Sequence, residues 1–203
     1  MQTPDWQKIH NEKAQSDTQY VASMDPSNGP REWIEVLANT LAATSKIFEY
    51  GTWPGANAIY LAEKWHKVSG QDVSDYMGKI FQENVSRREL IIPLEICSAQ
   101  EHIPSENYDA FVSAFVLLMP REDALMVIER MQKFTNPGGY NLLNMFMAGS
   151  SIARPERFYP TREEILDIYK DWAISREKIW AGKNTKGQEI IRMSILARKT
   201  ENT

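Results

Sequence analysis

Two glycines and two carboxylates lie in an order that suits the binding of an adenosine-bearing ligand. Glu49 lies in an apolar run, Gly51 and Gly55 follow it within a turn, and Asp72 ends the next short strand that we expect. Glycine lets the backbone pass close to a ligand, and a carboxylate at a strand end accepts hydrogen bonds from ribose hydroxyls. The spacing therefore predicts a strand–turn–helix–strand unit that binds a nucleoside. Trp53 is the misfit, because such a turn usually needs a very small residue there.

The elements that must position these residues alternate along the chain, and the periodicity of the apolar residues defines them. We expect helices over 31–43, 56–65, 74–84, 121–134 and 162–172, and strands over 45–50, 67–71, 90–97, 108–116 and 140–147. Pro93 limits its strand to a sheet edge or a broken ladder, and the Asn-Pro-Gly-Gly sequence over 136–139 predicts a turn. This alternation is typical of a mostly parallel sheet with helices on both faces.

The last third of the chain departs from the alternation. The segment over 177–180 leads to a polar turn over 184–187, and an apolar segment over 190–197 follows that turn. Two strands joined by a short polar turn predict an antiparallel hairpin at the sheet edge. The predicted fold class is therefore α/β, with a Rossmann-like, doubly wound, mostly parallel seven-stranded sheet and an antiparallel C-terminal hairpin.

Length and composition narrow the functional classes. A chain of 203 residues suits one substantial domain. Its formal charge of −4 and sequence pI of about 5.5 argue against nucleic acid as a partner. The sequence has no run of roughly 18 apolar residues, so we expect no membrane span. The polar N-terminus lacks a signal-peptide core. A single cysteine suits a reducing cytoplasm. With only three scattered histidines beside it, we expect no metal site.

Together, these segments resemble a known family. The order of elements, with a terminal hairpin after five strand–helix units, resembles the class I S-adenosylmethionine-dependent methyltransferases. More narrowly, it is similar to their small bacterial TehB-type and thiopurine-methyltransferase-like branch. The segments that carry the resemblance are 49–63, 70–74, 108–113, 136–142 and 196–199.

The resemblance implies S-adenosylmethionine as cofactor and a role for each matching residue. Glu49 would orient the loop, the two loop glycines would pass close to the methionine part of the ligand, and Asp72 would hold the ribose hydroxyls. The implied cofactor-binding set is Glu49, Gly51, Thr52, Trp53, Gly55, Asp72, Val73, Ser98, Ala99 and Ser113.

Three positions depart from the family's pattern. Its middle loop glycine is Trp53 here, its glycine before the second strand is Trp65, and its adenine-side acid is Ser98. A tryptophan at the helix end can simply pack, and a serine can still hydrogen-bond the adenine amino group. Trp53 either occupies the cofactor's place or points away and covers the pocket.

The acceptor side of the expected site is defined by fewer residues. Ser113 and Phe115 would face the sulfonium and the acceptor, and Arg154 and Arg157 would either clamp an anionic substrate or lie in a solvated loop. Methyl transfer depends largely on proximity and in-line orientation, and a soft thiol or selenol acceptor would need no strong general base. The catalytic residues therefore stay unassigned.

Several of these residues also have a purely structural interpretation. Asp72 would serve equally well as a cap for the following helix, and Asp109 suits the start of a strand. Cys97 suits a small buried hydrophobe better than a nucleophile. His10 is of interest because N-terminal helices in the family that this chain resembles often form a lid over the pocket.

We therefore predict a cytoplasmic S-adenosylmethionine-dependent methyltransferase that acts on a small-molecule acceptor. Its single domain, 1–203, would comprise an N-terminal helical lid (1–30), a cofactor-binding half (31–147), and a lid loop, helix and hairpin (148–203). The alternative is a non-catalytic, methyltransferase-like binding or regulatory protein whose pocket is blocked by Trp53. A nicotinamide-dependent oxidoreductase is disfavoured because the glycine spacing does not match Gly-x-Gly-x-x-Gly. The acceptor's identity and the oligomeric state stay open.

Overall fold

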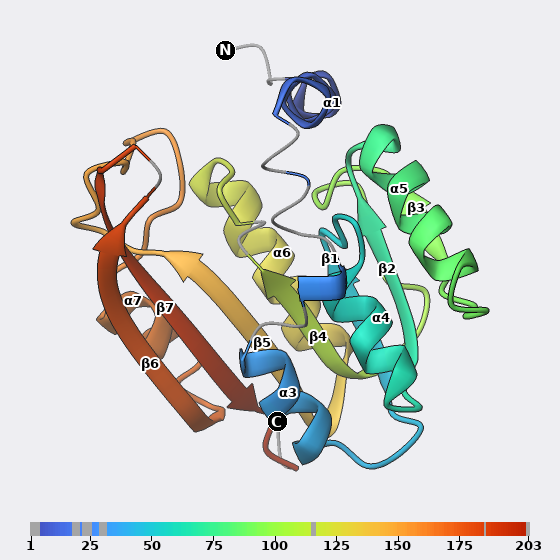
Figure 1. Cartoon of the computed structure of the whole chain (residues 1–203). Coiled ribbons are helices and arrows are strands. Elements are labelled where there is room, and N and C mark those ends of the chain that lie inside the picture. Colours follow the sequence, from blue (N-terminus) through green and yellow to red (C-terminus); the bar gives the residue numbers. More distant parts are fainter. Residues whose placement is uncertain are drawn as a thin grey trace. The chain divides into compact units, whose positions relative to one another are not determined.

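The computed structural model describes residues 5–17, 21, 26–28, 32–114, 117–184 and 186–201. Figure 1 shows its elements, which alternate between strands and helices over most of the chain. The strands are β1 (Lys46–Tyr50), β2 (Lys67–Asp72), β3 (Leu94–Ile96), β4 (Tyr108–Ala114), β5 (Thr135–Phe146), β6 (Ala173–Lys183) and β7 (Glu189–Arg198). The helices are α1 (Trp6–Ser16), the 3-10 helix η1 (Pro26–Asn28), α3 (Glu32–Thr40), α4 (Ala56–Glu63), α5 (Asp75–Ser86), α6 (Arg121–Phe134) and α7 (Arg162–Ile168).

The strand order across the sheet is β3-β2-β1-β4-β5-β7-β6. Strand β2 pairs in parallel with β1 and β3, and β4 pairs in parallel with β5. Strand β7 runs antiparallel to both β5 and β6. These pairings confirm the predicted Rossmann-like α/β fold, with its mostly parallel seven-stranded sheet and antiparallel C-terminal hairpin.

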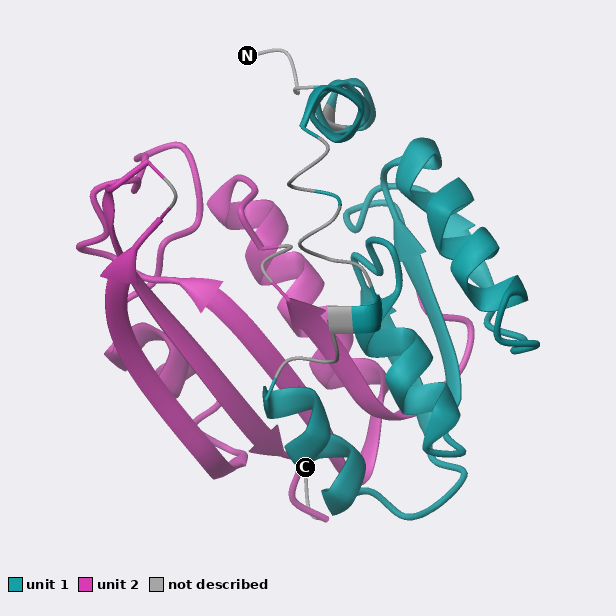
Figure 2. Ribbon diagram, in the orientation of Figure 1, with its two compact units in different colours: residues 1–102 teal, residues 103–203 magenta. Residues whose placement is uncertain are grey.

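The chain divides into two compact units, residues 1–102 and 103–203 (Figure 2). In the first unit, four of the five β1 residues are buried, as expected of a parallel strand that is covered on both faces. Ser74 caps the start of helix α5, because its hydroxyl accepts from the Met77 N–H at 3.1 Å. That cap confirms the helix start predicted from the sequence.

The second unit has its own apolar core. Helix α6 buries Ala124, Val127, Ile128 and Met131, which lie on one helical face. A polar chain lies at the base of β5: Thr135 donates to the Asn141 side chain, whose amide donates to the Tyr169 hydroxyl at 3.1 Å. Among the described residues, no helix is both long and apolar enough to cross a membrane.

Several predicted boundaries are wrong, for local reasons. The turn expected over 136–139 lies inside β5, where Tyr108 pairs with Thr135 but Ala110 pairs with Tyr140, so the intervening residues bulge. The strand expected over 90–97 is only Leu94–Ile96, because Pro93 has no N–H to continue the ladder. Helix α7 ends at Ile168 rather than at 172, and β6 begins at Ala173. The division into a lid and two halves stays a prediction.

Candidate functional site

The turn after β1 has an unusual backbone. Gly51, Trp53 and Gly55 have φ values of 73°, 54° and 102°. This left-handed region favours glycine, because a Cβ atom there crowds the following carbonyl. The N–H groups of Gly51 and Thr52 both donate to the Gln71 carbonyl, at 2.9 and 3.1 Å, which fixes the turn against the end of β2. The loop is thus a strained segment held in one shape by its neighbour strand.

Gly55 must be glycine for a second reason. A Cβ atom at this position would lie 2.9 Å from Phe81 Cδ2 and 3.0 Å from Ile59 Cδ1. The small residue therefore lets the start of α4 approach α5. Gly70 has a similar role on β2, since a Cβ atom there would lie 2.4 Å from the side chain of Thr52. Both glycines allow the loop to lie close against its surroundings.

Asp72, at the end of β2, holds the loop through its carboxylate. Oδ2 accepts from the Trp53 N–H at 2.9 Å, and Oδ1 accepts from the Ser74 N–H at 2.9 Å. The side chain is only 6% exposed, and burial raises its pKa although these backbone donors oppose the shift. Each carboxylate oxygen has a second lone pair, so both remain able to accept a further donor. Asp72 thus lies beside the glycine loop, as the sequence predicted, and also caps the turn into α5.

Two asparagines that the sequence interpretation missed brace the same loop. The Asn57 amide donates to Glu49 Oε1 at 2.8 Å and so links β1 to the start of α4. The Asn84 amide, on α5, donates to the Pro54 carbonyl at 2.9 Å. The position of Asn57, two residues after Gly55, was a usable signal. Asn84 had none, since its contact spans 30 residues of sequence.

Buried polar atoms at this loop indicate what kind of ligand it could bind. Thr52 Oγ1, Gln71 Oε1 and Asn57 Oδ1 are buried and have no hydrogen-bond partner within the described part of the chain. A buried polar group left unpaired costs about 1–3 kcal/mol, and such groups are rare unless they serve a ligand or water. Together with Asp72, they form a set of acceptors and one hydroxyl that fits a ligand rich in hydroxyl and amino groups.

The N-terminal helix α1 docks beside Asp72 through one side chain. Asn11 Oδ1 accepts from the Ser74 hydroxyl at 2.6 Å and from the Tyr76 N–H at 3.4 Å, while its amide donates to Asp75 at 2.5 Å. Asn11, rather than the His10 singled out from the sequence, makes these bonds to the first turn of α5. Helix α1 is thereby fixed to the segment that follows Asp72.

The remaining predicted residues of the first unit follow β2 and β3. Val73 is half-buried directly after Asp72, and Ala99 is buried. The Ser98 hydroxyl donates to Glu101 Oε2 at 2.8 Å, and the Ser98 N–H donates to the same oxygen at 3.2 Å. The position of the family's adenine-side acid is therefore a serine bonded to a carboxylate three residues later.

The predicted acceptor-side residues lie in the second unit, except that Phe115 falls outside the described residues. Ser113 is fully buried on β4, and its hydroxyl has no partner among the described residues. Arg154 is exposed, and the half-buried Arg157 donates its N–H to the Arg154 carbonyl at 3.0 Å in a loop turn. Asp109 accepts from the Asn136 amide at 2.8 Å, which is a structural contact.

The family model described as tellurite resistance protein TehB matches residues 30–190. A probable S-adenosyl-L-methionine-dependent methyltransferase TehB from Haemophilus influenzae strain 10810 is 29% identical over 140 residues, which are 68% of this chain and 49% of the relative. Hemagglutinin 1 of Eikenella corrodens is 25% identical over 135 residues, 65% of this chain and 45% of its own length. The chain spans about half the length of the curated relatives it matches.

Solved structures extend the likeness to the fold. The crystal structure of TehB from Haemophilus influenzae superposes with a TM-score of 0.76 at 24% identity, covering 84% of this chain and 63% of that one. The N-methyltransferase NodS from Bradyrhizobium japonicum WM9, in complex with S-adenosyl-l-homocysteine, gives a TM-score of 0.68 at 18% identity, covering 82% of this chain and 84% of NodS.

Proposed function

The chain belongs to the TehB family and has the class I methyltransferase fold, and from this premise we propose that it is an S-adenosylmethionine-dependent methyltransferase. Curated members of the family are described as probable enzymes of this kind. The observation that carries the proposal is the buried Asp72 carboxylate, tied to the backbone of the glycine loop by the Trp53 N–H. A glycine-rich turn after the first strand, with an acidic side chain further on, is the arrangement that binds the nucleoside part of such cofactors.

The residues of the first unit divide the work of binding. Asp72 accepts hydrogen bonds from the ribose hydroxyls. The Thr52 hydroxyl and the side-chain Oε1 of Gln71, which lack partners among the described residues, pair with polar groups of the ligand. Glu49, bonded to Asn57, keeps the loop in its bound shape. When bound, S-adenosylmethionine supplies an electrophilic methyl group on a sulfonium. Because the donor is already activated, the protein contributes mainly proximity and in-line orientation.

We further propose that the acceptor is a small molecule and that the protein works in the cytoplasm. The family's description favours an oxyanion such as tellurite as the first acceptor to test. Arg154 and Arg157 offer two guanidinium groups in one loop for an anionic acceptor. Ser113 is the proposed residue on the reacting side. The negative formal charge of −4 supports a partner other than nucleic acid.

The alternative function is a non-catalytic binding or regulatory protein. Trp53 favours it, since a half-buried indole stands in the loop where the family has glycine. Asp72 is also almost fully covered. Under this alternative, the loop keeps its shape but excludes the cofactor.

Thermal unfolding with added S-adenosylmethionine or S-adenosylhomocysteine tests the two functions together. A ligand present at 100 times its Kd stabilises by about 2.7 kcal/mol, which raises Tm by roughly 5–10 °C in a chain of this size. The same measurement on Trp53→Gly reports whether the indole blocks the site. Trp65→Gly is the matched control, because Trp65 also has a positive φ but is 80% exposed at the end of α4.

A shift in the wild-type protein supports the methyltransferase proposal, and release of S-adenosylhomocysteine on adding tellurite or a thiol identifies the acceptor class. A shift only in Trp53→Gly would establish the blocked alternative. No shift at millimolar ligand in any of the three proteins would contradict cofactor binding altogether.

A further inference from the structure

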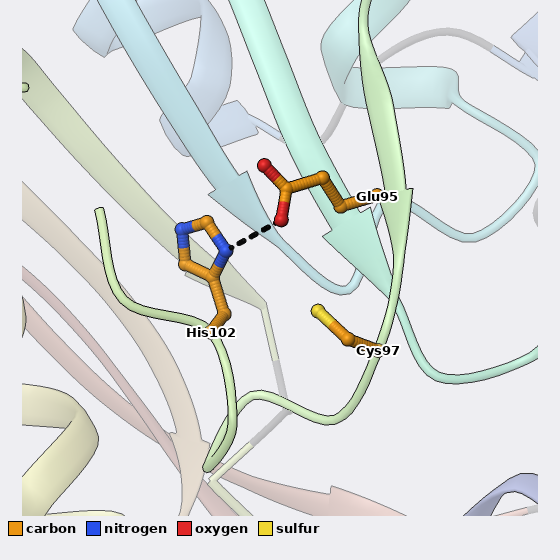
Figure 3. Close-up of side chains that lie close together, drawn as sticks. All are labelled: Glu95, Cys97 and His102. Carbon is orange, nitrogen blue, oxygen red and sulfur yellow. Dashed lines mark hydrogen bonds and ion pairs between the residues drawn. The ribbon is translucent and has the colours of Figure 1, made fainter. Parts of the chain in front are cut away.

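A second cluster of reactive side chains lies at the end of β3, within the first compact unit (Figure 3). Glu95 lies on β3, Cys97 follows the last residue of that strand, and His102 returns on the next loop. Figure 3 shows the three side chains converging from strand and loop. One carboxylate oxygen, the sulfur and one ring nitrogen all lie within 4.8 Å of one another. The cluster contains neither Asp72 nor any residue of the glycine loop.

The backbone presents Glu95 and Cys97 together. Residues i and i+2 of an extended segment project from the same face. Cys97 lies directly after the strand and is still held against the end of β2, because its N–H donates to the Asp72 carbonyl at 3.1 Å. Glu95 is exposed and Cys97 half-buried, so both side chains retain freedom to adjust.

His102, in contrast, is held before any ligand arrives. The loop folds back because the N–H groups of Glu101 and His102 both donate to the Ser98 carbonyl, each at 3.1 Å. The buried imidazole stacks on Phe48 with a centroid separation of 4.4 Å and meets Tyr50 edge-on at 5.5 Å. Packing of this kind fixes the ring orientation that a ligating histidine needs.

The donor types and one distance select the class of ligand. Sulfur, imidazole nitrogen and carboxylate oxygen are the three donors that zinc uses in proteins, whereas magnesium and calcium prefer oxygen alone. Bonds of about 2.0–2.1 Å to a tetrahedral ion place its nitrogen and oxygen ligands about 3.3 Å apart. Glu95 Oε2 and His102 Nδ1 are 3.2 Å apart. A cation can therefore replace the hydrogen bond between them while the two atoms keep nearly the same separation.

We propose that Glu95, Cys97 and His102 bind a thiophilic divalent cation of the zinc class, with water as the fourth ligand. The sulfur completes the set by a small side-chain movement, since it already lies within 4.8 Å of both other donors. The carboxylates of Glu95 and of the nearby Glu101 add negative charge that favours a cation. The site would fix the loop over 97–102. This inference goes beyond the proposed methyl transfer and does not depend on it.

Cobalt(II) binding to the 203-residue chain tests the site. After dialysis against a chelator, Co²⁺ is added and the absorption spectrum recorded. We expect one equivalent to bind, with a thiolate-to-cobalt charge-transfer band and the intense visible bands of a four-coordinate ion. The charge-transfer band identifies the site, because Cys97 is the only cysteine in the chain. Zn²⁺ should then displace the cobalt and abolish both features.

Variants distinguish a cation bound by all three side chains from one bound by the Cys97 thiol alone. Cys97→Ser should remove the charge-transfer band, and Glu95→Gln and His102→Gln should each weaken Co²⁺ binding at least tenfold. Glu95→Gln keeps the test valid if loss of the packed imidazole unfolds the protein, because Glu95 is exposed. Glu106→Gln, an exposed position in the same loop, is the matched control and should bind as the wild type does. No charge-transfer band at excess Co²⁺, or binding unchanged by Glu95→Gln, would overturn the proposal.

Discussion

Trp53 and Trp65 have the same side chain and both have a positive φ, yet they lie in different surroundings. Their φ values are 54° and 69°, a region that costs a non-glycine residue about 1–2 kcal/mol. Trp65 lies in the turn just after α4, with its N–H bonded to the Ala62 carbonyl at 2.9 Å and its side chain 80% exposed. Trp53 is half-buried, and its N–H is bonded to the buried carboxylate of Asp72.

The comparison separates backbone strain from function. Because the strain is similar at both positions, it does not by itself mark a binding site. What distinguishes Trp53 is the carboxylate that holds its N–H, together with the buried atoms of Thr52 and Gln71 that lack a partner among the described residues. We therefore expect changes in the loop to affect both ligand binding and stability, and changes at Trp65 to affect stability alone.

The largest effect is expected at Gly55, the most constrained position of the loop. Gly55→Ala combines a left-handed φ with a Cβ atom 2.9 Å from Phe81, so the free energy of unfolding should fall by about 2–4 kcal/mol. Gly187→Ala is the control, since that residue has φ 74° and no neighbouring atom within 4 Å. It should cost about 1 kcal/mol. Equal losses in urea unfolding would show that the loop is not tightly packed.

Asp72→Ala should lower the free energy of unfolding by about 2 kcal/mol, because it leaves the N–H groups of Trp53 and Ser74 without their acceptor. The loss is limited by the cost of burying a carboxylate. Since burial raises the pKa of Asp72 in the folded protein, part of its stabilising contribution is lost as pH rises through that pKa, and about 2 kcal/mol is what should remain at neutral pH. Asp171→Ala, at an exposed position, should change stability by less than about 0.5 kcal/mol. Urea unfolding at neutral pH measures the free energy of unfolding of both variants. Equal losses in the two would argue against a stabilising hydrogen bond between Asp72 and the loop.

Replacing Trp53 or Trp65 with glycine should change the free energy of unfolding by a smaller amount. Trp65→Gly relieves strain without losing buried contacts, so the free energy of unfolding should rise by about 0.5–1 kcal/mol. Trp53→Gly relieves similar strain but removes a half-buried indole, so its gain should be smaller or reversed. Chemical denaturation of the two variants gives the comparison directly. A larger gain at Trp53 would mean that its indole packs against nothing useful.

The smallest effect concerns His66, the residue after Trp65. Burial lowers its pKa below the usual 6.5, and its Nδ1 has no partner in the described part of the chain. The unfolded state therefore binds the proton more readily, so stability should be complete above pH 6.5 and decline below it. Tm measured between about pH 5 and 7.5 should show a shallower decline in His66→Gln. If Tm declined with pH in the same way in His66→Gln as in the wild type, His66 would be excluded as the source of that decline.

The sequence predicted the order of elements because apolar periodicity and turn residues are local signals. The segments around Gly51, Asp72 and Ser74 lie where their patterns predicted, and the C-terminal hairpin is confirmed. The bulge over 136–139 was missed because an Asn-Pro-Gly-Gly sequence has the same composition as a true turn. Only the pairing of β4 with β5 distinguishes the two.

The features that the sequence did not predict depend on contacts between distant segments. Asn84 reaches Pro54 across 30 residues, and Asn11 reaches Ser74 across 63, so neither had a local signature. The cluster of Glu95, Cys97 and His102 was missed for a different reason. Its spacing matches no zinc motif, and only the fold-back of the loop at Ser98 brings the histidine beside the strand.

Calorimetric titration of S-adenosylhomocysteine into the wild-type protein and Asp72→Asn tests the central claim most directly. The isosteric variant keeps the shape of the side chain but removes the charge and one of its acceptor oxygens. We predict a single site in the wild type and a Kd at least tenfold weaker in Asp72→Asn, equivalent to about 1.4 kcal/mol. Absence of binding in both proteins, or equal affinity in the two, would contradict the claim that Asp72 and the glycine loop form an adenosyl site.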